Sequence, residues 1–131
     1  TNWDSIFTFN NWGMTDLDKN SDNVFFAVGG SGKIYKSTSY GYDWDTIPSV
    51  TNKYLSEIIF FDNQNGCIVG DDGIILRTSD NGNTWTIIQS ATTDRLYALD
   101  FFDSMNGVAV GQDNYLSQEN TILKTTDGGL K

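Results

Sequence analysis

Short apolar runs separated by turn-forming residues set the pattern of this 131-residue chain. In its middle part, apolar or alternating runs fall at residues 55–62, 66–70, 74–79 and 84–89. Asn-Gly and Asp-Gly pairs stand between these runs, and such pairs are typical of tight turns that join neighbouring strands. The pattern therefore predicts four short strands in one antiparallel meander, with no helix in residues 55–89.

The same unit recurs along the chain. A step of 41 residues separates successive members of two sets of landmarks: Trp3, Trp44 and Trp85, and Gly29, Gly70 and Gly111. Self-similarity at a period near 40 is a signature of propellers and solenoids. We expect an all-β fold, a β-propeller portion of three four-stranded antiparallel blades, with the third lacking its last strand. Residues 1–131 form one such unit, and its repeats, counted from Trp to Trp, are 3–43, 44–84 and 85–131.

The outer repeats extend the same prediction. Strands are expected at 14–20, 24–29, 33–38 and 43–48 in the first blade, and at 96–103, 107–111 and 121–126 in the third. Aligned apolar positions define the expected core, and burial of each side chain contributes roughly 1.5–3 kcal/mol. They are Ile6, Ile47 and Ile88; Leu17, Ile58 and Leu99; Val28, Val69 and Val110; Ile34, Ile75 and Ile122.

The sharpest motif is the run Thr78-Ser79-Asp80-Asn81-Gly82-Asn83-Thr84-Trp85. Asp and Asn bond to nearby backbone amides, Gly allows a positive φ, and Trp supplies a large apolar anchor. We assign a structural role to the matching residues of three copies: Ser37, Gly41 and Trp44; Thr78, Asp80, Gly82 and Trp85; Thr125, Asp127 and Gly129. Ser39 replaces Asp in the first copy, so its turn should be less well tied, and the third copy stops before its Trp.

These residues resemble the Asp-box of sialidase-type propellers, of sortilin-type receptors and of photosystem II assembly-factor-like propellers. The longer run 69–85 is most similar to the last group, and many secreted bacterial surface proteins carry similar repeats. The resemblance implies a propeller of the BNR type. It does not imply an activity, because this turn belongs to a fold that hosts many functions.

Charge and composition exclude several classes of function. The net charge is −9 with only eight Lys and Arg, which argues against nucleic acid and anionic membrane surfaces as partners. No apolar run approaches 18 residues, so we expect no membrane insertion. The single Cys67 aligns with Val108 on a predicted strand and is expected to be a small buried hydrophobe.

We expect no catalysis, no metal and no cofactor. Sialidases grip a carboxylate with three Arg, and this chain has only Arg77 and Arg95 and contains no His. The run Asp16-Leu17-Asp18-Lys19-Asn20-Ser21-Asp22 has the oxygen spacing of a calcium loop. It lacks Gly at the sixth position and Glu at the twelfth, which favours a polar strand end and turn. Lys36, Arg77 and Lys124 recur at one position, either offsetting nearby Asp on exposed blade edges or contacting a shared partner.

The candidate ligand face combines loops that a propeller places at one end of its blades. An insertion at residues 112–120 breaks the period, and the loops between repeats bring further aromatics to the same end. The expected ligand-binding residues are Trp12, Tyr54, Arg95 and Tyr115. A tolerated surface insertion with incidental aromatics is the alternative.

From this face we expect the chain to be a non-catalytic binding or scaffold module of a secreted or cell-surface protein. We expect its location to be extracytoplasmic and its partner to be a protein or a glycan. The alternatives are an assembly or chaperone-like factor, and part of a sialidase-like glycoside hydrolase whose catalytic residues lie outside this chain. Residues 3–9 match the strand that the third repeat lacks. The ring is therefore expected to be completed by further blades of one longer chain or by a head-to-tail homo-oligomer.

Overall fold

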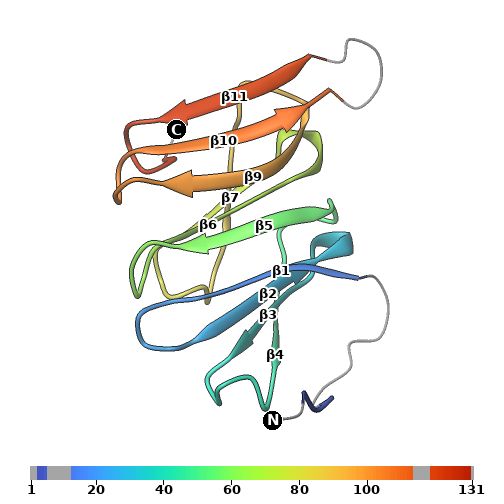
Figure 1. Cartoon of the computed structure of the whole chain (residues 1–131), viewed down its shortest axis with the longest axis vertical. Coiled ribbons are helices and arrows are strands. Elements are labelled where there is room, and N and C mark those ends of the chain that lie inside the picture. Colours follow the sequence, from blue (N-terminus) through green and yellow to red (C-terminus); the bar gives the residue numbers. More distant parts are fainter. Residues whose placement is uncertain (1–2, 6–12, 114–118, 131) are drawn as a thin grey trace.

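The computed structural model describes residues 3–5, 13–113 and 119–130, and the structural statements below concern these residues. Three antiparallel sheets follow one another along the chain, face to face (Figure 1). Blade 1 contains β1 (Met14–Lys19), β2 (Phe25–Gly29), β3 (Ile34–Ser37) and β4 (Asp45–Ile47). Blade 2 contains β5 (Leu55–Phe60), β6 (Gly66–Gly70), β7 (Ile75–Thr78) and β8 (Thr86–Ile88). Blade 3 contains β9 (Arg95–Phe101), β10 (Gly107–Gln112) and β11 (Asn120–Thr125).

This layout confirms the predicted all-β architecture of four, four and three strands. Each sheet is an antiparallel meander in sequence order, as the turn signals predicted. The first strand of each blade also carries an irregularity that the sequence pattern did not reveal. The pairing register slips once, between Met14 and Asp16 and, 41 residues later, between Leu55 and Glu57. The same slip occurs in β9 opposite Val110 and Gly111.

In blades 1 and 2 the turn between the second and third strand is a single 3₁₀ turn. In blade 2 it covers Asp71–Gly73, where Asp72 has φ 55° and Gly73 has φ 67°. Two consecutive left-handed residues suit a two-residue hairpin turn, which is why an Asp-Gly pair stands here. No other helical turn occurs in residues 55–89, and no helix in the described part of the chain is long and apolar enough to cross a bilayer.

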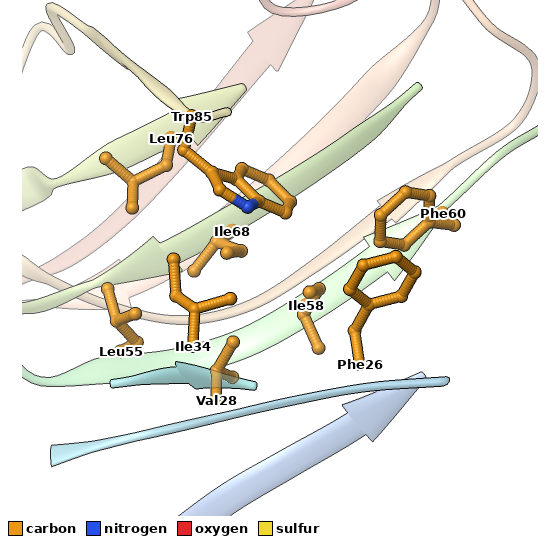
Figure 2. Close-up of a cluster of buried hydrophobic side chains, with 9 residues drawn as sticks. All are labelled: Phe26, Val28, Ile34, Leu55, Ile58, Phe60, Ile68, Leu76 and Trp85. Atoms are coloured by element: carbon orange, nitrogen blue, oxygen red, sulfur yellow. The ribbon is translucent and has the colours of Figure 1, made fainter. Parts of the chain in front are cut away.

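The main core lies between blades 1 and 2. Its buried side chains come from the facing surfaces of both sheets (Figure 2). Phe26 of blade 1 stacks on Phe60 of blade 2 with ring centroids 4.2 Å apart, and Trp85 meets Phe60 edge-on at 6.0 Å. The other members are Val28, Ile34, Leu55, Ile58, Ile68 and Leu76. A second cluster joins blades 2 and 3 and contains Cys67, Val69, Leu96, Leu99 and Ala109.

Three expected core residues are exposed instead. Leu17 is 54%, Val110 is 41% and Ile122 is 72% exposed. Their aligned counterparts are buried, or partly buried in the case of Ile75, because each of those faces a neighbouring blade, whereas these three lie on the outer surfaces of blades 1 and 3. Burial in this fold is therefore decided by the next blade and not by the strand pattern alone. The expected core position Ile6 lies outside the described residues.

Candidate functional site

The turn at residues 78–85 is held by two side chains. Thr78 Oγ1 accepts hydrogen bonds from Gly82 N at 3.0 Å and Asp80 N at 3.3 Å, and donates to Asp80 Oδ1 at 2.8 Å. Asp80 also accepts from Thr84 N at 2.9 Å and from the Thr84 hydroxyl at 2.6 Å. The pKa of Asp80 lies below its usual value: burial acts in the opposite direction, and the bonds from Thr84 and Thr78 outweigh it. Thr78 and Asp80 thus close the turn by reciprocal bonding.

The other two copies use the same bonds with one change. Thr125 Oγ1 accepts from Gly129 N at 2.8 Å, and its hydroxyl donates to Asp127 Oδ1 at 2.7 Å. In the first copy, Ser37 Oγ accepts from Gly41 N at 2.9 Å and Ser39 Oγ accepts from Asp43 N at 2.8 Å. The Ser39 hydroxyl therefore takes over the backbone bond that a carboxylate makes elsewhere. Trp44 Nε1 donates to Gly41 O at 2.8 Å.

The recurring cation of the third strand connects consecutive blades. Lys36 of β3 donates to Asn81 O at 2.7 Å, and Arg77 of β7 donates to Gly128 O at 2.6 Å. Asn81 and Gly128 occupy the same left-handed position of successive turns, with φ 60° and 72°. Both cations are buried, so the expectation of charges on exposed blade edges is wrong for them. Burial lowers the pKa of Lys36, and the charge of Asp80 opposes this shift.

Arg77 also stabilises its own blade. Its Nη1 donates to Gly66 O at 2.9 Å and Thr78 O at 3.0 Å, and its guanidinium lies 4.6 Å from the Phe61 ring centroid. Because all its hydrogen-bond acceptors are backbone carbonyls, Arg77 has a structural role and its guanidinium is not free to bind a substrate.

Acidic side chains of the first strands make a second set of inter-blade contacts. Asp16 Oδ2 accepts from Ile58 N at 2.9 Å, and Asp18 Oδ2 accepts from Phe60 N at 2.7 Å. Glu57, aligned with Asp16, accepts from Leu99 N. The calcium-like spacing thus places two of its carboxylates on the backbone of the next blade. Asn20 of the same run is buried and donates to Asn63 O and Asn81 Oδ1.

Two of the four expected ligand-binding residues lie together. The Arg95 guanidinium is 4.6 Å from the Tyr54 ring centroid and 5.5 Å from that of Tyr97, and its Nε forms an ion pair with Asp71 Oδ1 at 2.6 Å. Both tyrosines are exposed and Arg95 is half-buried. This Tyr54–Arg95–Tyr97 surface lies at the end of the blades opposite the Asp-box turns. Trp12 and Tyr115 lie outside the described residues. The alignment of the three repeats did not reveal Tyr97, because the aligned residues Thr15 and Ser56 are not aromatic.

A cavity of about 430 Å³ lies between blades 2 and 3. Its lining is largely apolar and comes from both blades; it includes Cys67, Val69, Ile75, Leu99, Ala109 and Leu123. We call this cavity the inter-blade slot. Burial raises the pKa of the Cys67 thiol to about 12, so this residue lines the slot as a hydrophobe.

Three successive meanders, each closed by an Asp-box turn and joined by inter-blade cations, define a portion of a BNR-type β-propeller. The matching family model is described as "Photosynthesis system II assembly factor YCF48" and covers residues 1–79. The chain belongs to this family.

Two solved structures share the fold. One is YCF48 from Cyanidioschyzon merolae, with a TM-score of 0.76 and 17% identity over 92% of this chain and 38% of that one. The other, titled "YCF48 bound to D1 peptide", gives a TM-score of 0.73 and 19% identity over 95% of this chain and 44% of that one. The present chain thus spans about two fifths of each. A search of the curated proteins finds no match to this sequence.

The family finding corrects one expectation. The secreted or cell-surface, extracytoplasmic setting expected from the sequence is wrong, because the chain belongs to a family named for the assembly of a photosynthetic complex. The resemblance to assembly-factor-like propellers is confirmed, and the assembly-factor alternative is better supported than the surface module.

Proposed function

We propose that this chain is a non-catalytic polypeptide-binding module of the assembly-factor type, with residues 1–131 acting as one propeller portion. The observation that carries the proposal is the Tyr54–Arg95–Tyr97 surface, together with membership of an assembly-factor family. A related propeller that shares this fold is titled as bound to a D1 peptide, which supports a polypeptide as the partner.

The chemistry of this surface suits a peptide. Exposed tyrosines offer rigid apolar area with a polar end, and Arg and Tyr are enriched among the residues that dominate binding energy. The ion pair with Asp71 restrains the Arg95 side chain before any ligand binds. Such preorganisation reduces the entropic cost of binding. The backbone carbonyls and side-chain acceptors of an extended segment are natural partners for the N–H donors of its guanidinium. Trp12 and Tyr115 remain predicted contributors to the same face.

The test is a fluorescence anisotropy titration of the chain with a labelled D1 peptide and with a scrambled peptide of the same composition. We expect saturable binding of the first and much weaker binding of the second. Arg95→Gln and Tyr54→Ala should each weaken binding by about 30-fold, the effect of a typical hot-spot residue.

Tyr42→Ala is the matched control, because Tyr42 is an exposed tyrosine in the Asp-box turn at the opposite end of the blades. It should bind as the wild type does. Equal affinity for both peptides, or unchanged affinity in both site variants, would contradict the proposal.

A further inference from the structure

The turn Asp71–Gly73 of blade 2 joins the two segments that carry the Tyr54–Arg95–Tyr97 surface. Asp71 N donates to Tyr54 O at 2.9 Å, and Gly73 N donates to Asp94 O at 2.7 Å. Tyr54 directly precedes β5 of blade 2, and Arg95 begins β9 of blade 3. Backbone hydrogen bonds of this turn therefore hold the surface residues of two blades together.

Blade 1 forms the equivalent bond without any side chain. At the 41-residue step, Gly30 aligns with Asp71, and Gly13 aligns with Tyr54 and, one step further, with Arg95. Gly30 N donates to Gly13 O at 3.2 Å. The fold thus needs only the backbone at these positions, so the side chains that blades 2 and 3 place there are available for recognition.

The Asp71 side chain compensates the charge of Arg95. Asp71 Oδ1 lies 2.6 Å from Arg95 Nε, and both side chains are partly buried. Within the described residues neither of these two atoms has a hydrogen-bond partner, so the ion pair is the contact that offsets their burial. Arg95 is therefore a paired cation that lies beside the Tyr54 and Tyr97 rings.

Two further acidic side chains flank this ion pair. Asp72, the next residue of the turn, forms an exposed ion pair with Lys53. Asp94, which precedes Arg95, accepts a hydrogen bond from the Thr121 hydroxyl. Together with the Arg95–Asp71 pair, these residues bring two positive and three negative charges to the surface.

This arrangement disfavours an acidic ligand. A carboxylate binds Arg most strongly through two parallel N–H donors, and Asp71 already occupies Nε of Arg95. A ligand carboxylate beside Arg95 would also approach the neighbouring carboxylates, and like charges placed together in an interface repel strongly. An uncharged segment meets no such repulsion, and it can still pack on the tyrosine rings and accept from the remaining N–H groups of Arg95.

We propose that Asp71 determines the charge specificity of the Tyr54–Arg95–Tyr97 surface: it pairs with Arg95 so that the surface binds uncharged polypeptide segments and rejects acidic ones. The proposal rests on the proposed function and names the class of segment that the same surface takes. Without Asp71, the Arg95 guanidinium would be an unpaired cation and would attract the carboxylates that the native surface repels.

Fluorescence anisotropy with matched peptides tests this specificity. Two variants of the labelled D1 peptide, in which the same two uncharged residues are replaced by Gln or by Glu, differ in charge and not in size. We expect the native chain to bind the Gln variant about 10-fold more tightly than the Glu variant. The ratio of these two dissociation constants is the quantity to follow, because a general loss of binding or of stability leaves it unchanged.

Asp71→Asn should abolish this preference. The change keeps the size of the side chain and an acceptor oxygen but removes the charge, so the Glu variant should bind at least as tightly as the Gln variant. Asp71→Gly, which installs the residue found in blade 1, should fold and lose the preference in the same way.

Asp72→Asn is the matched control. It removes one negative charge from the neighbouring residue, whose ion pair with Lys53 is exposed and contributes little. The ratio of the two dissociation constants should stay within about threefold of the native value. An equal effect of Asp72→Asn and Asp71→Asn would show that net charge, and not the pairing of Arg95, sets the preference, which overturns the proposal.

The remaining outcomes separate this proposal from the proposed function. If none of the three peptides binds the native chain, the proposed function is wrong, and Asp71 has no specificity to determine. If the peptides bind but the native chain does not distinguish Gln from Glu, only the role of Asp71 is overturned. The same holds if Asp71→Asn and Asp71→Gly, both folded by circular dichroism, keep the native ratio. Failure of both variants to fold would show that the fold itself requires Asp71, which also overturns its proposed role.

Discussion

The inter-blade cation Arg77 gives the most direct test of what holds the blades together. Replacing Arg77 by Met keeps an apolar side chain in place of the aliphatic part of Arg and removes the N–H donors of the guanidinium. Three backbone carbonyls then lose a charged partner: Gly128 O of the next Asp-box, and Gly66 O and Thr78 O of the same blade. The contact of the guanidinium with the Phe61 ring at 4.6 Å is lost as well.

The magnitude follows from these contacts. A buried polar group left without a partner costs about 1–3 kcal/mol, and water can reach part of this site once the side chain is gone. Counting two of the three carbonyls as unsatisfied, we expect Arg77→Met to lower the free energy of unfolding by about 2–4 kcal/mol. A domain of this kind has a total stability of about 5–15 kcal/mol, so the effect is large.

Urea unfolding followed by tryptophan fluorescence is the assay. With an m-value of about 2 kcal/mol/M, the midpoint should fall by about 1–2 M. Arg77→Lys should lose about half as much, because Lys36 makes the equivalent bond to Asn81 O with a single ammonium group. Lys53→Met is the control, since Lys53 forms an exposed ion pair with Asp72 and such pairs contribute about 0–1 kcal/mol. If Arg77→Met and Lys53→Met have the same midpoint, the cation does not fasten the blades.

Three further predictions follow from single contacts. Gly82→Ala should lower the midpoint of urea unfolding strongly, because Gly82 has φ 67° and an added Cβ would lie 2.3 Å from Phe26; Gly13→Ala, which meets nothing within 4 Å, should change it little. Burial, and then the nearby charges of Asp16 and Asp100, raise the pKa of Glu57, although the hydrogen bond from Leu99 N acts in the opposite direction. The ionisation of Glu57 therefore lowers the stability of the folded chain as the pH rises through that raised pKa. Glu57→Gln, which keeps an acceptor oxygen, should therefore be at least as stable as wild type at pH 7 by urea unfolding, and a clear loss would show that the charge stabilises. Cys67, whose pKa is about 12, should react with a thiol reagent at pH 8 only as the chain unfolds, and rapid labelling of the folded chain would contradict its burial.

Local chemistry made much of this fold predictable. An Asp-Gly turn needs left-handed residues, an Asp-box needs a hydroxyl and a carboxylate at fixed positions, and both signals recur at one period. The strand positions and the meander order follow from these local rules. The predicted ends extend one or two residues beyond many observed ends because pairing stops where the backbone turns away.

Only some residues of the candidate ligand face could be predicted from the sequence. Tyr54 and Arg95 were placed at one end of the blades by alignment, and the structure brings them within 4.6 Å of each other. Tyr97 was missed because its counterparts in the other repeats are small polar residues. Tyr97 lies where the pairing register of β9 slips, and this slip cannot be read from the sequence pattern.

The sequence by itself determined the period, the strand order and the turns, because each depends on residues close together in the chain. The tertiary structure decided which side chains are buried and which charges do structural work. Lys36 and Arg77 are buried because the next blade supplies carbonyl acceptors, whereas Lys124 at the same repeat position is exposed. Ile34 is buried and Ile122 exposed for the same reason: a strand pattern defines an apolar face, and only a neighbouring sheet removes that face from water.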